Sequence, residues 1–171
     1  MATSYIVTFI GDDRPGLVEQ LSSVIQRNGG NWLESRLSQL GGKFAGLILV
    51  TLPADDGKAL EADLNALAAS GISVRVTPTT ERKAPEAGRN ITLTVLGPDR
   101  LGIVREISHA LAKRQINVTN MESEVRSAPM SAEMIFSANI EAWIPEGTRL
   151  DDLQDTLDDI ANHMTLEIDL E

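Results

Sequence analysis

The sequence predicts an α+β protein built from two tandem βαββαβ units, each with an antiparallel sheet and both helices on one face. The main observation is a repeat: GDDRPGLV at residues 11–18 returns as GPDRLGIV at residues 97–104, 86 positions later. The second observation is that both halves change between the apolar periods of strands and helices in the same order. The third is a charged segment between the halves that has no apolar periodicity.

Turn and helix signals define the elements of the first unit. Pro15 suits the first turn of a helix, and Asn28-Gly29-Gly30 is typical of a helix end. Gly41-Gly42 predicts a two-residue hairpin turn. The expected elements are strand 4–10, a helix after Pro15, strands 31–40 and 43–52, helix 56–70 with Leu60, Leu64, Leu67 and Ala68 on one stripe, and strand 72–77.

The repeat extends through the first helix and beyond it. The apolar set Leu17, Val18, Leu21, Val24 and Ile25 falls on Ile103, Val104, Ile107, Ala110 and Leu111 at the same offset. Later segments realign at an offset of 92 or 93, with Leu60, Leu64 and Leu67 on Leu153, Leu157 and Ile160. The second copy therefore has about six extra residues, which we place in a hairpin loop near residues 127–131.

The boundary between the copies lies near residue 85. The segment TTERKAPEAGR at residues 79–89 is charged and contains Pro85 and Gly88, as an exposed linker does. We expect a first unit at residues 1–79, a linker at 80–89 and a second unit at 90–171. A right-handed parallel crossover around each helix gives a split-βαβ arrangement in each unit.

Charge and composition exclude several classes of function. The net charge is -10, and residues 90–171 carry 15 Asp and Glu against 6 Lys and Arg, so direct nucleic-acid binding is not expected. The chain has no cysteine, which excludes disulfide scaffolds and thiol catalysis and fits a reducing compartment. No apolar run is long enough to span a membrane, and no export signal is seen, so we expect a cytoplasmic protein.

The residues predict no enzyme, no cofactor and no metal site. His109 and His163 fall on different expected elements without acidic or histidine partners at ligand spacing, and we expect both to be surface or core residues. The phosphate-loop, nucleophile-elbow and zinc-protease motifs do not occur. The acidic segment from Asp151 to Asp159 is interpreted as a solvated helix face, with protein docking as the alternative.

The repeated element G-x-D-R-x-G-[LI]-V lies at a strand-to-helix junction. Asp13 and Asp99 can accept hydrogen bonds from the first-turn N–H groups, and Gly16 and Gly102 permit a close approach of backbone or ligand. A helix N-terminus of this kind can hold a small carboxylate. On spacing alone, a purely structural turn and a ligand-binding loop are equally compatible with this pattern.

Two asparagines occupy matching positions after the first helix of each copy. We place Asn31 and Asn117 at the start of a strand beside the loop, where their side chains can bond an amino or carboxylate group. The alternative for both residues is a helix cap or turn.

The D-R-P-G-L-V motif after the first strand and the Gly-Asn start of the second strand resemble the ACT domain, a ferredoxin-like regulatory module. Two such units without a catalytic domain resemble the glycine cleavage system transcriptional repressor family. By position, the resemblance implies that the ligand-binding residues are Asp12, Asp13, Arg14, Pro15, Gly16, Leu17 and Asn31 in the first copy, and Asp99, Arg100, Leu101, Gly102, Ile103 and Asn117 in the second.

The resemblance also implies a function. It implies a sensor of an amino acid, glycine or a similar one, that represses through a DNA-binding partner protein and touches neither nucleic acid nor membrane. Because a single split-βαβ unit leaves its sheet edges open, we expect the two units of the chain to pair through edges or sheet faces. A homodimer is compatible with the resemblance. The alternative is a ligand-free scaffold that only binds other proteins. Leu101 stands where the first copy has Pro15, so the two copies need not bind equally.

Overall fold

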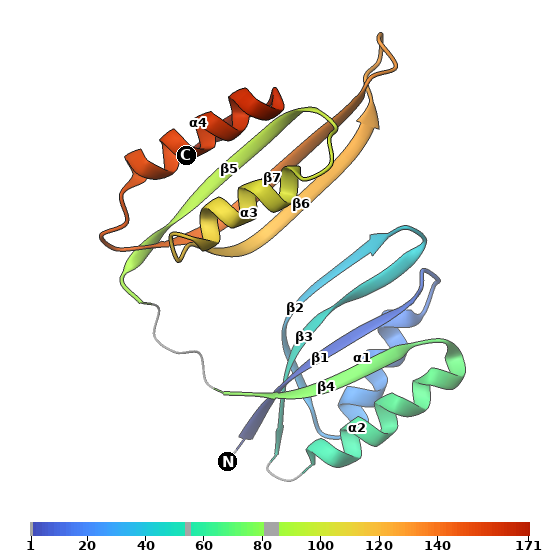
Figure 1. The fold of residues 1–171 in the computed structure, drawn as a ribbon. Helices are drawn as coiled ribbons and strands as arrows, with labels where there is room; N and C mark the ends of the chain where they lie inside the picture. Colours follow the sequence, from blue (N-terminus) through green and yellow to red (C-terminus); the bar gives the residue numbers. More distant parts are fainter. Residues whose placement is uncertain (1, 54–55, 81–85) are drawn as a thin grey trace. The chain divides into compact units, whose positions relative to one another are not determined.

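The structure is a computed structural model that describes residues 2–53, 56–80 and 86–171. The chain divides into two units, Met1–Lys83 and Ala84–Glu171. In each unit, four strands form one antiparallel sheet and the helices cover one of its faces (Figure 1). The predicted fold class, two tandem βαββαβ units, is confirmed.

Unit 1 has the strand order β2-β3-β1-β4, so β1 lies inside the sheet and β2 at an edge. Its first helix crosses over between two parallel strands, β1 and β2, because both pair antiparallel to β3. The elements are β1 (Ala2–Asp12), α1 (Leu17–Arg27), β2 (Asn31–Leu40), β3 (Lys43–Pro53), α2 (Gly57–Asn65), the 3-10 helix η1 (Ala66–Ser70) and β4 (Ser73–Thr79).

Unit 2 repeats this topology with the order β6-β7-β5-β8. Its elements are β5 (Gly88–Pro98), α3 (Ile103–Ala112), β6 (Asn117–Ser127), β7 (Met134–Pro145), α4 (Leu150–Met164) and β8 (Glu167–Leu170). Matching residues of the two units therefore occupy the same places in the two sheets, which permits a comparison position by position.

The two hairpins account for the difference in length between the copies. In unit 1, Gly41 and Gly42 have φ angles of 59° and 77°, and a two-residue hairpin turn of type I′ requires positive φ at both positions. In unit 2, the turn spans residues 128–133 and is closed by a bond from the Ala128 N–H to the Glu133 carbonyl, 2.8 Å. The extra residues thus lie in the predicted loop.

Each unit has its own apolar core between the sheet and its helices. The predicted stripes are buried on the first helices, except that Val18 and Val104 are 40% and 45% exposed at matching positions. No polar or charged side chain among the described residues is buried. The fully buried side chains include Leu21, Ile25, Ile48, Leu60 and Leu64 in unit 1, and Leu93, Ile103, Ile107, Leu111 and Leu153 in unit 2.

The second helix of unit 1 differs from the prediction. It is α-helical only to Asn65 and continues as a 3-10 turn to Ser70, whereas α4 is continuous over 15 residues. Because a 3-10 turn has three residues, the four-residue stripe is lost after Asn65. Ala68, predicted on the buried stripe, is therefore exposed, while Leu67 is half-buried.

The predicted linker is shorter in the structure at its C-terminal end. Strand β5 begins at Gly88 and pairs with β7, so Gly88 and Arg89 lie opposite Pro145 and Ile144. The sequence does not indicate a strand at these two residues, because glycine is uncommon in strands and the neighbouring residues are charged. Residues 81–85 of the predicted linker lie outside the described residues.

Candidate ligand-binding loops

Each unit has a short loop between its first strand and its first helix, at the repeated motif. The backbone N–H of Asp13 donates to the Gly42 carbonyl at 3.1 Å. The N–H of Asp99 donates to the Met134 carbonyl at 2.8 Å. In both units the loop is therefore fixed to the adjoining strand hairpin, at the same end of the sheet.

A glycine in the left-handed region precedes each first helix. Gly16 has φ 89° and ψ -2°, and Gly102 has φ 95° and ψ -1°. Apart from the glycine and the residues on either side of it, no described atom lies within 4 Å of the place that a Cβ would take at either position. Glycine is thus required here by the backbone conformation, and the space above it is open.

The expected capping by aspartate is wrong. The residues at the N-cap positions are Gly16 and Gly102, and no described side chain caps either helix. Asp13 and Asp99 lie three residues earlier, where their own N–H groups are bound to the hairpin, and both side chains are exposed. The first-turn N–H groups of α1 and α3 therefore have no side-chain acceptor from the described residues.

The close approach expected at the cap glycines occurs instead at the strand glycines of the motif. A Cβ on Gly11 would lie 3.1 Å from the Leu17 side chain. A Cβ on Gly97 would lie 2.8 Å from the Thr165 carbonyl and 2.7 Å from the Leu166 side chain. These two glycines let the strand end pass against its neighbours, so their role is in packing.

The motif arginine connects the loop to the end of the second helix in both units. Arg14 donates to the Ser70 carbonyl at 3.0 Å and to the Gln20 Oε1 at 3.2 Å. Arg100 donates to the Thr165 Oγ1 at 3.4 Å. A cation is favourable at a helix C-terminus, so the arginine stabilises the position of the loop.

Asp12 forms an ion pair that unit 2 does not have. Its partner is Lys43, directly opposite on β3, and the corresponding residues of unit 2 are Pro98 and Ile135. The hydrogen bond from Lys43, and then its charge, lower the pKa of the Asp12 carboxyl below the ordinary value of 3.8. Lys43 was not identified from the sequence as a residue of the site. Its position follows from the antiparallel pairing of the first and third strands, which puts it opposite Asp12.

The apolar residues predicted for the site have different surroundings. Leu17 and Ile103 are 3% and 2% exposed and belong to the cores, so only their backbone N–H groups can face a ligand. Leu101 is fully exposed. Of the other predicted loop residues, Asp12, Asp13, Pro15, Gly16, Asp99, Arg100 and Gly102 are exposed and Arg14 is half-buried.

The expected proximity of Asn31 and Asn117 to the loops is wrong. Asn31 is opposite Thr51, eight positions along β3 from Lys43, which faces the loop end of β1. That separation is about 26 Å at the usual rise of a strand. Asn117, opposite Trp143, is equally far from the second loop. Parallel strands start at the same end of a sheet, so the crossover itself places these residues away from the loops.

In the described part of the chain, the His, Asp and Glu side chains form no cluster that could hold a metal ion. His109 and His163 are exposed on α3 and α4. None of the described helices is long and apolar enough to cross a membrane.

Comparison with known protein families supports the duplication seen in the sequence. The family description of the ACT domain matches residues 3–77 and, a second time, residues 91–142. The chain belongs to the ACT domain family. The two matches include both loops, so the tandem ACT organisation predicted from the motif is confirmed.

Two solved structures match the ACT pair over its whole length. An unknown protein from Galdieria sulphuraria is 30% identical, with a TM-score of 0.89, and the match covers 100% of this chain and 98% of that one. A proposed glycine cleavage system transcriptional repressor is 20% identical, with a TM-score of 0.73, over 100% of this chain and 97% of that one. The second likeness shows a shared tandem fold. No curated protein matches the sequence significantly.

Proposed function

We propose that this tandem ACT protein is a non-enzymatic regulator that senses an amino acid, glycine or a similar one, and acts on transcription through a protein partner. The observation that carries the proposal is the repeated loop. In each unit, a helix N-terminus without a side-chain cap opens next to an exposed aspartate. The positive helix end is complementary to the carboxylate of an amino acid, and the aspartate is complementary to its ammonium group.

The carboxylate of the ligand fits the helix end. Unpaired first-turn N–H groups and the positive end of the helix dipole attract a small anion. Because the cap residue is glycine, no Cβ covers this position. The hydrogen bonds of Asp13 and Arg14 hold the first loop from both sides, so little ordering is needed on binding.

The ammonium group of the ligand fits the loop aspartate. Asp13 and Asp99 are exposed, and neither caps its helix, so both carboxylates are available to an ammonium ion. We propose one such site in each unit. Leu101 in place of Pro15 gives the second loop an additional apolar surface and hence a different affinity.

The charge of the chain favours a protein partner over DNA. Residues 90–171 carry 15 acidic and 6 basic residues, and this balance repels a phosphate backbone. A DNA-binding transcription factor as partner therefore provides the contact with DNA. Ligand binding regulates that partner if the ligand binds one of two conformations of the protein more tightly.

Thermal unfolding with a panel of amino acids tests the proposal. A ligand at about 100 times its Kd adds roughly 2.7 kcal/mol to the stability of the native state, and each kcal/mol raises the Tm of a chain of this size by roughly 2 to 4 °C. Asp13→Ala and Asp99→Ala should each remove the shift of one site. Glu61→Ala, at an exposed position on α2, is the control and should keep the full shift.

A ligand-free scaffold is the second candidate function, and one observation favours it. Within a unit, the loop and the asparagine assigned to the same site lie at opposite ends of the sheet. A small ligand cannot touch both. If no amino acid shifts the Tm, and Asp13→Ala leaves binding of the partner protein unchanged, the scaffold function replaces the sensor.

A further inference from the structure

The sheet of unit 1 has a second face that the helices of its own unit leave uncovered. Residues opposite each other in the register lie on the same face, so the side chains of this face are identified by their pairings. Leu49 pairs with Ile6, Leu47 with Thr8, and Ala45 with Ile10 on the two central strands. Ile10 and Leu47 are 49% and 50% exposed. We call these six residues the open face of unit 1.

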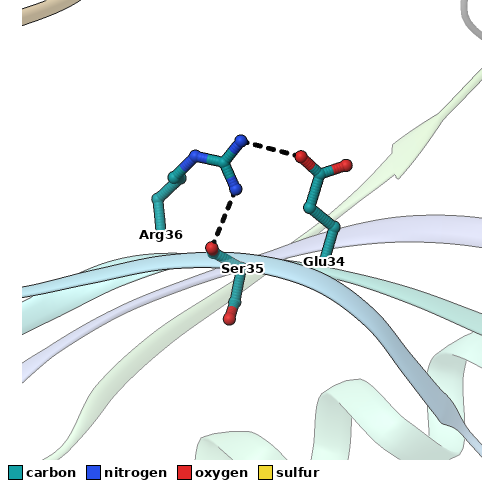
Figure 2. Close-up of polar contacts among 3 residues, drawn as sticks. All are labelled: Glu34, Ser35 and Arg36. Carbon is teal, nitrogen blue, oxygen red and sulfur yellow. Dashed lines mark hydrogen bonds and ion pairs between the residues drawn. The ribbon is translucent and has the colours of Figure 1, made fainter.

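A polar rim surrounds the open face. On the β2 side, the rim consists of Glu34, Arg36 and Ser38, which pair with Leu49, Leu47 and Ala45. Figure 2 shows Glu34 and Arg36 on one side of β2, joined by an ion pair of 2.8 Å, with the Ser35 side chain on the other. On the β4 side, Ser73, Arg75 and Thr77 complete the rim. An apolar centre with a polar rim is the arrangement of a protein interface.

The same positions of unit 2 show that the fold does not require this apolar centre. Asn139 and Glu141 replace Leu47 and Leu49, and Thr92 and Thr94 replace Ile6 and Thr8. Only Ile10 has an apolar counterpart there, Leu96, which is 48% exposed. The surrounding strands place Glu122, Glu124, Glu167 and Asp169 on that face, with Arg126. The matching face of unit 2 is mostly polar and acidic, so the fold alone does not explain why the open face of unit 1 is apolar.

We propose that the open face of unit 1 binds the open face of unit 1 in a second copy of the chain. In a dimer with twofold symmetry, one patch meets itself, so an apolar centre is matched and both charge signs of the rim are present on each side. Residues 1–80 carry 6 basic and 8 acidic residues, against 6 and 15 in residues 90–171. Contact through this weakly charged half meets less charge repulsion than contact through the acidic half would.

The area of the open face together with its polar rim predicts the strength of the dimer. Four strands about 4.8 Å apart and three rows of same-face residues about 6.8 Å apart cover about 400 Å². A stable interface typically takes about 800 Å² from each partner. The dimer is therefore weak and forms only as the protein concentration rises.

Sedimentation equilibrium over a range of concentrations, on the full chain, tests this inference. Leu47→Glu should weaken the dimer by more than about tenfold, because an unpaired carboxylate is costly to bury. The matched control is Asn139→Glu, at the same position of unit 2, which should dimerise as the wild type does. A wild type that stays monomeric at all concentrations, or a Leu47→Glu variant that dimerises normally, overturns the proposal.

A crosslinking experiment makes the result independent of the stability of Leu47→Glu. The chain has no cysteine, so Thr8→Cys introduces a single thiol at the centre of the open face. Packed sheets lie about 10 Å apart, so a bismaleimide of that length should join two copies. Thr94→Cys is the matched control in unit 2, and equal crosslinking of both variants contradicts the proposed interface.

Discussion

The two ACT units share a topology and a pattern of buried residues, and they differ where the fold makes no demand. Leu21 and Ile107 occupy matching core positions and are fully buried in both units. Leu47 and Asn139 also match, on the uncovered faces, and one is apolar while the other is polar. The comparison teaches that the ACT fold constrains the helix-covered side of each sheet and leaves the open side free for another role.

The two loops also share the features that hold their backbone in place and differ in other residues. Both units keep the glycine at positive φ, the N–H bond of the aspartate to the hairpin, and the arginine that reaches the second helix. They differ at two positions that are exposed in unit 1, where Pro15 and Asp12 match Leu101 and the half-buried Pro98 of unit 2. The geometry of the loop is thus common to both units, and its surface is specific to each.

The largest effect is expected for matched changes in the two cores. Leu21→Ala and Ile107→Ala should each lower the free energy of unfolding of their own unit by about 2 to 5 kcal/mol, through lost burial and the cavity left behind. Hydrogen exchange resolved by peptide should show faster exchange in the altered unit alone. Equal loss of protection in both units would contradict the independence of the two cores.

A smaller and equal effect is expected for the two cap glycines. Gly16→Ala and Gly102→Ala should each cost about 1 to 2 kcal/mol, because a side chain is unfavourable at positive φ. Urea unfolding measures this. Gly16→Asn is the control and should cost less than Gly16→Ala, since asparagine tolerates this region. A larger cost for asparagine would mean that space, and not conformation, selects the glycine.

The motif arginines should differ between the units. Arg14→Met removes two hydrogen bonds and should cost unit 1 about 1 kcal/mol, whereas Arg100→Met removes one long bond and should cost less. Chemical denaturation followed separately in each unit compares the two values. The reverse order would show that Arg100 makes a stronger contact with the second helix than its 3.4 Å distance indicates.

The smallest effect concerns the acid dependence of stability. The pKa of Asp12 is lowered in the folded protein, so its ion pair stabilises unit 1 above pH 3.8 and this contribution is lost as the pH falls through the folded pKa. NMR titration of the Asp12 carboxyl should give a pKa below 3.8, and Lys43→Met should return it toward that value. Unit 2, with Pro98 and Ile135 at these positions, lacks this contribution.

Much of the fold could be predicted because its signals are local. The repeat, the glycine turn at Gly41-Gly42 and the buried stripe of α1 are features of a few neighbouring residues, and the structure confirms them. The predictions that were wrong depend on contacts beyond the segment. Asp13 does not cap α1 because the N-cap position is taken by Gly16, three residues later, and Ala68 leaves the buried stripe where α2 tightens into a 3-10 turn.

The sequence by itself determined the tandem ACT organisation and the two loops, since a duplicated motif and apolar periodicity are visible without coordinates. Tertiary structure alone decided what each loop residue does and which residues meet. The strand order separates Asn31 from the loop and places Lys43 opposite Asp12. It also gathers Ile6, Leu47 and Leu49 on one face. The physical reason is that a face of a sheet is assembled from several strands, and pairing between distant segments sets their register.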